Sequence, residues 1–425
     1  MLPPSTNPQT PIPAGALDGL TLMRYAHIYR ARSSGGVEQY LRHLNRGLLL
    51  RHRMTILQMH LTREGETAEV EIEAVGLGRI LWIPVPVRQS ASRLADLPAR
   101  IRFLAAQARQ PEGFNWPAFL RSLSGGHLRY PAVVFSDALP SLLQSQQVGL
   151  LAFHWLNYDA AALIAQARRC SIPYVLINHF DNQRLASPET RAWVRQATAI
   201  ASVSSQGLPP ELENRCVNLS DAVDTEFFSP TACSAEVEPV VLLPARICER
   251  KGHRDLIEAA RILQAQGTHL ILSFVGAVES PALLDELRQA AAAAGLAQQV
   301  RFLGEISAES LRDAYAQCSL VALPSYSEGL PRVLIEAQAM AKPVVAYDNS
   351  GMKEAVIDGE TGFLVKTGDV QALADRIGSL LRDPAQRLRF GQQGRAFILR
   401  QFAIPALIQR HEAFYLQALQ PKPAA

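Results

Sequence analysis

Two glutamates eight residues apart, Glu328 and Glu336, stand in the segment of the chain with the most specific chemical pattern. The apolar run that ends at Pro324 predicts a strand, and Pro331 marks the start of a predicted helix, so Glu328 lies in the intervening loop. Backbone N–H groups in such a loop and at a helix N-terminus suit a phosphate or a hydroxyl group. Considered alone, the two residues are also compatible with a solvated loop acid and a helix-surface carboxylate.

Two cations, Arg246 and Lys251, occur in a second loop of this kind. They follow a predicted strand over 240–245 and precede a predicted helix. Because parallel strands end at the same edge of a sheet, we expect these cations to lie near the loop that holds Glu328. The guanidinium fork of an arginine and the mobile charge of a lysine together suit a diphosphate. Two exposed cations of an ordinary surface loop are the alternative interpretation.

Polar candidates in the first half of the chain also stand where predicted strands end. They are His154, Asn178, His179 and Asp181. A histidine at the end of a strand is more often a hydrogen-bonded structural residue than a catalytic one. Gly35 and Gly36 follow the first predicted strand and would allow a close approach of the backbone to a ligand. This segment lacks the G-x-G-x-x-G pattern of dinucleotide oxidoreductases, which argues against hydride transfer.

The elements that must position these residues follow from the hydrophobic pattern. Over 240–402, predicted strands alternate with single helices of roughly 10 to 15 residues, which indicates right-handed crossovers and a parallel sheet covered by helices. Residues 20–218 show a noisier version of the same pattern. Between these parts the periodicity lapses over 219–239, where we expect a linker. The proline-rich residues 1–19 predict a flexible tail, and 403–420 have the apolar spacing of an amphipathic helix.

The composition excludes several classes of protein. With 48% hydrophobic and 19% charged residues, the chain is typical of a globular protein. Five widely spaced cysteines without a C-x-x-C pair imply neither a disulfide framework nor a metal site. No apolar run reaches the roughly 18 residues that span a bilayer, and the N-terminus lacks the pattern of a signal peptide. We therefore expect a cytoplasmic protein.

The charge balance argues against nucleic acid as a partner, because 42 basic and 39 acidic residues leave a formal net charge of only +3. The arginines are nevertheless unevenly distributed. From Arg24 to Arg63 there are eight arginines and one acidic residue, Glu38. This excess is compatible with a solvated face, with a surface for anionic lipid head groups at the inner face of the membrane, or with a phosphate-bearing acceptor.

These segments together resemble the retaining glycosyltransferases of the GT-B fold, glycosyltransferase family 4 (glycosyl transferases group 1). The E-x7-E motif of that family corresponds to Glu328 and Glu336, and its R-x4-K pair to Arg246 and Lys251. Further similar stretches are S-G-G-V-E-Q-Y-L from Ser34, D-A-V-D-T-E-F-F from Asp221 and S-G-M-K-E-A-V-I-D-G-E-T-G-F-L-V from Ser350. The resemblance covers nearly the whole chain and is strongest over 240–402.

The resemblance implies an α/β protein with two doubly wound, Rossmann-like parallel-sheet domains that face each other across a cleft. The domain over 20–218 would lie on the acceptor side, with Asn178, His179 and Asp181 as candidates there. The domain over 240–402 would bind the nucleotide sugar, and the helix over 403–420 would cross back to the first domain.

The same resemblance assigns roles to the site residues. Glu336 would accept hydrogen bonds from the ribose hydroxyls of the donor, while Glu328 and the backbone of Gly329 and Leu330 would hold its sugar and diphosphate. Arg246 and Lys251 would neutralise the leaving diphosphate. In the first domain, the catalytic set would include His154 near the donor sugar, and the loop with Gly35 and Gly36 would approach the donor phosphates.

The implied reaction moves a sugar from a nucleoside-diphosphate sugar to a hydroxyl of a glycan, lipid-linked or small-molecule acceptor. The anomeric configuration would be retained, without a metal ion, a cofactor or a protein nucleophile. Such enzymes serve polysaccharide or glycolipid biosynthesis. Three alternatives stay open: a sugar-nucleotide epimerase of this fold, a phosphorylase of this fold, and a catalytically inactive, transferase-like partner protein.

Overall fold

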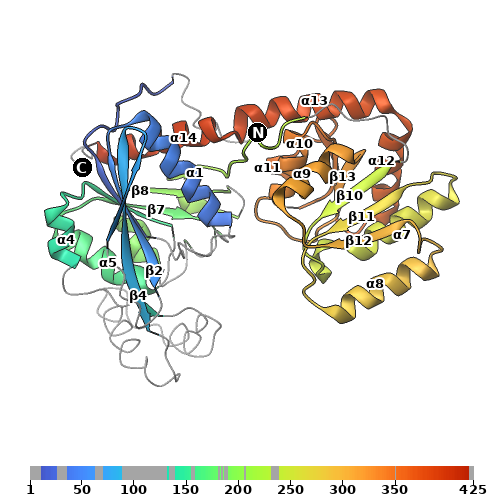
Figure 1. Cartoon of the computed structure of the whole chain (residues 1–425), viewed down its shortest axis with the longest axis horizontal. Helices are drawn as coiled ribbons and strands as arrows, with labels where there is room; N and C mark the ends of the chain where they lie inside the picture. The colour runs from blue at the N-terminus through green and yellow to red at the C-terminus, as the bar shows by residue number, and fades with distance from the viewer. Residues whose placement is uncertain are drawn as a thin grey trace. The chain divides into compact units, whose positions relative to one another are not determined.

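The protein is described by a computed structural model, in which the chain divides into two compact units. The first unit comprises residues 1–219 together with 408–425, and the second comprises 220–407 (Figure 1). The structure describes residues 11–25, 36–62, 70–88, 132–133, 139–154, 158–179, 182, 185, 190–204, 207–230, 239–349 and 351–420. Among these residues, no helix combines the length and the apolar character needed to cross a membrane.

The second unit is built on a six-stranded sheet in the order β12-β11-β10-β13-β14-β15. The strands are β10 (Val240–Pro244), β11 (Ile271–Val275), β12 (Val300–Gly304), β13 (Leu320–Leu323), β14 (Val344–Asp348) and β15 (Gly362–Lys366). All neighbouring pairs are parallel. The chain proceeds outward from β10 in one direction and from β13 in the other, so the topological switch point lies between β10 and β13. Ligands of doubly wound sheets bind at this point, beyond the carboxyl ends of the strands.

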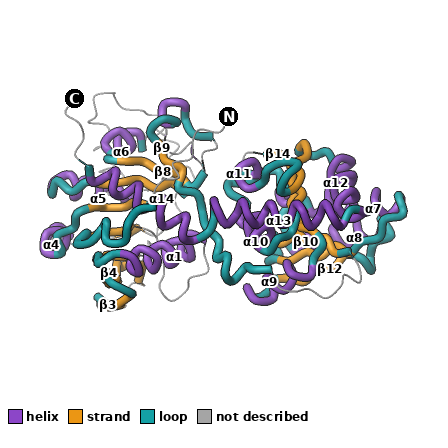
Figure 2. Tube along the Cα trace, turned by 90° about the horizontal axis from the view of Figure 1, so that it is seen from above, coloured by secondary structure: helices purple, strands orange, loops and turns teal. Residues whose placement is uncertain are grey.

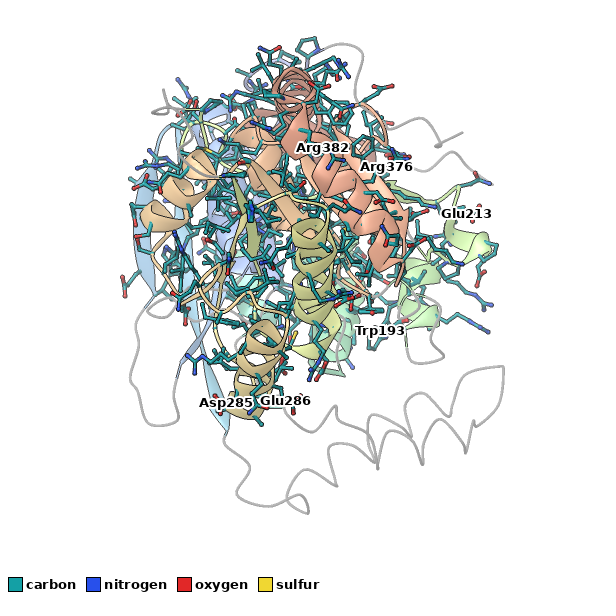
Figure 3. All side chains as sticks on the ribbon, turned by 90° about the vertical axis from the view of Figure 1, so that its right-hand side faces the viewer. Trp193, Glu213, Asp285, Glu286, Arg376 and Arg382 are labelled. Carbon is teal, nitrogen blue, oxygen red and sulfur yellow. The ribbon has the colours of Figure 1, made fainter. Side chains whose placement is uncertain are left out.

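Helices connect these strands, as the sequence predicts, and Figure 2 shows strands and helices in separate colours. The connecting helices are α7 (His253–Ala265), α8 (Pro281–Ala293), α9 (Ala308–Gln317), α10 (Arg332–Ala339) and α11 (Met352–Ala355), and α12 (Val370–Arg382) and α13 (Pro384–Gln401) follow the last strand. Ser280 and Ser307 cap α8 and α9 by accepting hydrogen bonds from Leu283 N and Ser310 N. α7 packs against α12, and α10 packs against α13. Charged residues of α8 and α12, such as Glu286 and Arg382, are exposed (Figure 3).

The described part of the first unit contains a larger sheet, with the order β3-β4-β2-β1-β6-β7-β8-β9 and with β5 paired to β4. Its strands are β1 (Thr21–Tyr25), β2 (Thr55–Thr62), β3 (Glu71–Val75), β4 (Gly78–Arg88), β5 (Ala132–Val133), β6 (Leu150–Phe153), β7 (Tyr174–Asn178), β8 (Ala199–Ser202) and β9 (Cys216–Asn218). β3 and β5 run antiparallel to β4, whereas the other pairs are parallel. Its switch point lies between β1 and β6.

Helices of the first unit cover both faces of this sheet. They are α1 (Gly36–Arg51), α4 (Leu139–Ser145), α5 (Tyr158–Arg169), α6 (Arg191–Gln196) and α14 (Ile404–Leu419), of which α14 belongs to the first unit from Ile408 onward. Met23 and Tyr25 of β1 pack in one core with Leu163 of α5. α14 approaches α1 closely, because a Cβ atom at Gly47 would lie 2.0 Å from Ile408 Cδ1.

The expectation of a flexible tail over 1–19 is wrong for residues 11–19, which the structure describes. Leu17 is buried, with only 2% of its surface exposed. Gly15 N donates to Arg51 O at 3.0 Å and to His52 Nδ1 at 3.1 Å, and Arg53 N donates to Asp18 Oδ1 at 2.7 Å. This segment therefore adds an apolar contact and several hydrogen bonds to the C-terminal end of α1.

The boundary between the units falls after Leu219, at the start of the expected linker over 219–239. Residues 220–230 pack on the second unit, where Val223 and Phe228 belong to the hydrophobic core. Val223 N also donates a hydrogen bond to Phe402 O at 2.8 Å. This part of the expected linker is thus ordered, while 231–238 lie outside the described residues.

Candidate functional site

Two loops meet at the switch point of the second unit, one between β10 and α7 and one between β13 and α10. Gly252 has a φ of +71°, and a Cβ atom there would lie 2.0 Å from Pro324 O. In addition, Tyr326 N donates to Arg250 O at 2.8 Å, and Ser325 Oγ donates to the same oxygen at 3.0 Å. The two loops are thus held together by backbone contacts that only glycine permits at position 252.

These contacts bring the predicted cation and glutamate together. Lys251 Nζ donates a hydrogen bond to Glu328 Oε1, and the two side chains are only 13% and 11% exposed. Arg250 NH1 lies 3.8 Å from Glu328 Oε2 and donates to Ser327 O at 3.0 Å. Arg250 was not predicted as a site residue from the sequence. Its position directly before Lys251, in the same loop, was the only signal that could have indicated it.

Arg246 lies at the start of the same loop, and its side chain is exposed. Within the described residues, no hydrogen bond or ion pair engages its guanidinium group. The loop after β11 runs beside it, because Ile247 N donates to Ala277 O at 2.9 Å and a Cβ atom at Gly276 would lie 2.4 Å from Ala245 O. Of the two cations that the sequence predicts for this loop, Arg246 is thus exposed and Lys251 is paired.

Glu336 lies on α10 with its side chain 12% exposed, and it has the polar partner that its apolar surroundings require. Tyr315 Oη donates to Glu336 Oε2 at 2.9 Å, and Arg332 Nε lies 4.0 Å from Glu336 Oε1. Burial raises the pKa of Glu336 above its ordinary value, although Arg332 and Tyr315 oppose this shift. Arg332 NH1 also donates to Asp221 Oδ2 at 2.7 Å.

Tyr315, Arg332 and Asp221 were not predicted as partners of Glu336. Arg332 precedes Glu336 by one helical turn, which is a readable signal. For Asp221, the only signal of a role at the site was its place in the D-A-V-D stretch that resembles the family. Tyr315 comes from α9, and its contact with Glu336 depends on tertiary packing that no local pattern indicates.

The backbone of Gly329 is held by the loop after β14. A Cβ atom at Gly351 would lie 1.6 Å from Gly329 O, whereas one at Gly329 itself would meet nothing within 4 Å. Asn349 Nδ2 donates to Ser325 O at 2.5 Å. Leu330 follows directly, and α10 begins at Arg332, so the amide groups of this turn lie at a helix N-terminus. Three loops of the second unit therefore converge at Glu328.

A tyrosine pair next to these loops was also missed by the sequence analysis. Tyr326 Oη and Tyr347 Oη both donate to Asp255 Oδ2, at 2.8 and 2.5 Å. Tyr347 is fully buried, whereas Tyr326 is 47% exposed. Asp255 thus anchors the loop after β13 to the first turn of α7.

In the first unit, His154 is engaged on both sides of its ring. Its Nε2 lies 2.9 Å from Arg24 NH1, and its Nδ1 lies 2.9 Å from His179 Nε2. His154 is only 1% exposed. Burial, with Arg24 and His179 as further causes, holds its pKa well below the ordinary value of 6.5. Both nitrogens of His154 therefore take part in internal hydrogen bonds, and neither is left for a ligand.

The remaining candidates of the first unit have different surroundings. His179 follows β7, and burial together with Arg24 lowers its pKa to about 3. Asn178 is buried and donates to Asn182 Oδ1 at 2.9 Å, which indicates a structural role. Gly36 begins α1. Gly35 and Asp181 lie outside the described residues.

Residues 225–397 match the model of the family described as Glycosyl transferases group 1. This segment contains Arg246, Lys251, Glu328 and Glu336. The match to this family lies within the second unit.

Two curated relatives show how far the similarity extends. The chain is 33% identical over 198 residues to a GDP-mannose-dependent alpha-(1-6)-phosphatidylinositol monomannoside mannosyltransferase of Mycolicibacterium smegmatis, which covers 43% of this chain and 51% of the relative. It is 31% identical over 302 residues to a D-inositol 3-phosphate glycosyltransferase of Mycobacteroides abscessus, covering 63% of this chain and 64% of the relative. The chain thus matches less than two thirds of either relative's length.

A solved structure shares the fold over almost the whole chain. It is the crystal structure of HepE from Anabaena in complex with UDP, with a TM-score of 0.64 and 17% sequence identity, covering 93% of this chain and 99% of that chain. At this identity the similarity concerns the fold alone. The predicted fold class, an α/β protein with two parallel-sheet domains of the GT-B type, is confirmed.

Proposed function

We propose that the chain is a retaining glycosyltransferase that moves a sugar from a nucleoside-diphosphate sugar to a hydroxyl of a glycan, lipid-linked or small-molecule acceptor. The observation that carries this proposal is the meeting of Lys251 and Glu328 at the switch point of a group 1 domain. The loops there combine cations, a carboxylate and the N-terminus of α10 at the edge where doubly wound sheets bind ligands. A nucleoside diphosphate is the ligand whose charges this set of groups suits best.

In this proposal, Lys251 and Arg246 neutralise the diphosphate as it leaves. Arg246 is exposed and meets the phosphates directly, whereas Lys251 exchanges part of its contact with Glu328 for a phosphate oxygen. The amides of Gly329 and Leu330 add donors at the N-terminus of α10. The cations and these amides thus supply the charge stabilisation, and the proposal requires no metal ion or cofactor.

Glu336 receives the ribose hydroxyls of the donor. Its carboxylate is held by Tyr315 and Arg332 and has little exposure, so it is a fixed acceptor rather than a mobile surface acid. Asp221 binds the other side of Arg332 and so fixes the orientation of this cation. A carboxylate held in this way accepts two hydroxyl hydrogen bonds without the entropy cost of ordering a free side chain.

The transfer itself breaks the bond between the anomeric carbon and the diphosphate oxygen, and the electron pair leaves with that oxygen. The acceptor hydroxyl attacks the oxocarbenium-like sugar from the face that the diphosphate vacates. Its proton passes to the departing phosphate oxygen, so charge and atoms balance without a protein nucleophile. The sugar therefore keeps its anomeric configuration in the product.

The binding step is tested by thermal unfolding of the protein with UDP, GDP, ADP, CMP and their sugar conjugates. A ligand at 100 times its Kd adds about 2.7 kcal/mol to the free energy of unfolding, which raises the unfolding midpoint by several degrees. We expect a shift with one diphosphate and a larger shift with one of its sugars. The absence of any shift would contradict the proposal and favour an inactive partner protein.

We further propose that the first unit meets an anionic lipid surface through the outer face of α1. Arg42, Arg46 and Leu50 follow one another at helical spacing and are exposed, Leu50 by 55%. Leu77, which is 54% exposed, lies beside them because its N–H donates to Leu49 O at 2.7 Å. Cations interleaved with exposed leucines suit the head groups and the upper acyl region of an anionic bilayer at the cytoplasmic face.

Co-sedimentation with liposomes tests this surface. At moderate salt we expect the protein to pellet with phosphatidylglycerol vesicles and to stay in solution with phosphatidylcholine vesicles. The double variant Arg42→Glu/Arg46→Glu should lose the binding, whereas Arg191→Glu, a charge change of equal sign at an exposed position of α6, should keep it. Wild-type protein that stays wholly in the supernatant would contradict membrane docking.

A further inference from the structure

Arg24 of β1 is a buried cation that has no carboxylate partner in the described part of the chain. The residue is fully buried, and only NH1 of its guanidinium group is hydrogen-bonded, to His154 and to Tyr415 Oη at 2.9 Å each. Its Nε and NH2 atoms are buried without a hydrogen-bond partner. Burying a guanidinium group without a counter-charge costs several kcal/mol, so chance alone is a poor explanation for its presence in the middle of the sheet.

The partners of Arg24 determine which nitrogens of two histidines carry protons. A guanidinium group can only donate, so His154 Nε2 must accept. The proton of His154 is therefore on Nδ1, which donates to His179 Nε2 at 2.9 Å. Because Nε2 of His179 accepts in turn, the proton of this second ring is on Nδ1. Both rings are neutral, and the chain of hydrogen bonds ends in an N–H group at His179.

We propose that Arg24 is a positioning residue that acts through His154 and fixes His179 as a neutral hydrogen-bond donor beyond the carboxyl end of β7. Among the described residues, His179 Nδ1 has no partner of its own, so this N–H is left for a ligand. His179 then donates to an oxygen of the substrate and cannot serve as a base. That the oxygen belongs to a sugar or phosphate rests on the proposed function, whereas the arrangement of protons does not.

The C-terminal helix holds the other side of Arg24. Tyr415 accepts from NH1, and its ring lies 5.6 Å from the guanidinium carbon. His411 Nδ1 lies 3.1 Å from Tyr415 Oη, and His411 Nε2 forms a hydrogen bond with Tyr40 Oη of α1. Among the described residues, the groups that surround the two histidines are Arg24, Tyr40, His411 and Tyr415, and none of these four is acidic. No carboxylate within this cluster stabilises a protonated imidazole.

The first test is the protonation of the two rings in the full-length protein, measured by ¹⁵N NMR with labelled histidine. Signals are assigned by their loss in His154→Gln and His179→Gln. We expect both rings to carry the proton on Nδ1, with Nε2 unprotonated, from pH 8 down to pH 5. A proton on His154 Nε2, or a titration of either ring with a midpoint near 6.5, would overturn the proposal.

Variants of Arg24 show whether it imposes this arrangement. In Arg24→Met, which has a similar length but no donor, we expect His154 to show both tautomers and the two rings to titrate at higher pH. Arg24→Lys restores a donor and should restore the Nδ1–H form, while Arg191→Met, at an exposed position of α6, should change nothing. An unchanged spectrum in Arg24→Met would contradict the positioning role. If that variant does not fold, the tautomer of His154 in Arg24→Lys and in the wild type decides whether Arg24 has the positioning role.

The role of the donor at His179 is tested by two substitutions of this residue. Asn offers an amide N–H near the position of Nδ1, whereas Leu offers none. With the nucleotide sugar that the protein binds, we expect His179→Leu to lower kcat/KM by about tenfold or more relative to His179→Asn. The cause is the loss of one hydrogen bond to a substrate oxygen. Equal rates would contradict a donor role. A protein that binds no nucleotide sugar would refute the proposed function but would leave the NMR result valid.

Discussion

Among the individual residues of the candidate site, several cations and carboxylates are already paired with one another. Glu328 holds Lys251, with Arg250 3.8 Å away, and Arg332 is shared between Glu336 and Asp221. Under the proposed function, a diphosphate that enters would compete with Glu328 for Lys251. Such charge-assisted contacts are worth more than contacts between neutral groups, because the side chains are mostly withdrawn from water.

Removal of either paired group should reduce transfer and leave the fold intact. We expect Lys251→Ala and Glu336→Gln each to lower the rate of sugar transfer by roughly tenfold or more, since each deletes a charge-assisted contact with the donor. Arg261→Ala is the matched control, because Arg261 pairs with Glu258 on the exposed side of α7. Circular dichroism checks the fold. Wild-type rates in both site variants would refute the assignment.

The buried histidine His154 makes stability depend on pH. Its pKa is held well below 6.5 in the folded protein, so it stays neutral there, whereas in the unfolded chain it binds a proton below about pH 6.5. The unfolded state thus binds more protons, and stability falls as the pH falls, by about 1.4 kcal/mol for this group between pH 7.5 and 5.5.

Urea unfolding at pH 7.5 and 5.5 measures this contribution. We expect the wild type to lose more free energy of unfolding over this interval than His154→Gln, which has no imidazole at this position. The difference isolates His154 from the other groups that titrate in the same range. Equal losses in the two proteins would show that His154 is not held neutral.

At the scale of elements, the close approach of the loops after β10 and β13 decides whether the site can form. Gly252 and Gly267 both have a positive φ, +71° and +77°, but only a Cβ atom at Gly252 would meet Pro324 O. Gly267→Ala is therefore the control for backbone strain, which costs about 1 to 2 kcal/mol in each variant. Gly252→Ala should lose more stability than Gly267→Ala and also lose diphosphate binding.

Thermal unfolding with and without the diphosphate compares the two variants directly. We expect the ligand to raise the midpoint of Gly267→Ala as it does that of the wild type, and to leave the midpoint of Gly252→Ala unchanged. A ligand-induced shift of equal size in both would mean that the contact with Pro324 does not shape the site.

The sequence predicted these loops well because their strands are continuous apolar runs between helices with clear periodicity. β3 was missed, since its sequence Glu-Ile-Glu-Ala-Val is mostly exposed and has the charge of an edge strand. The resemblance placed His154 near the donor sugar, and it did not indicate that both nitrogens of its ring form hydrogen bonds within the protein. Its partner Arg24 is 130 residues away in the chain, and no local pattern indicates such a pair.

At the scale of the whole molecule, the first unit is assembled from both ends of the chain. Glu412 of α14 is fully buried and binds His52 Nε2 at 2.8 Å and Arg51 Nε at 2.6 Å. The sequence indicated an amphipathic helix here but not its buried acid, because the partners lie 360 residues away. In the sequence, residues 220–407, which form the second unit, separate these two parts of the first.

Removal of this carboxylate should destabilise the first unit and spare ligand binding in the second. We expect Glu412→Leu to lower the free energy of unfolding by about 3 to 5 kcal/mol, because it removes the acceptor of the buried His52 and of the partly buried Arg51. Gln417→Leu, at an exposed position of the same helix, should have little effect. Calorimetry measures both the unfolding and the affinity for the diphosphate. A stable variant, or one that folds but has lost this affinity, would contradict the account.

The central claim, retaining transfer from a nucleotide sugar, is tested most directly by ¹H NMR of the reaction with the donor that stabilises the protein. We predict release of the nucleoside diphosphate, together with a product in which the transferred sugar has the anomeric configuration of the donor. Glu336→Gln should slow both signals together. Inverted configuration would contradict the retaining mechanism, and a donor that binds but is never cleaved, with acceptors of all three classes present, would contradict the transferase itself.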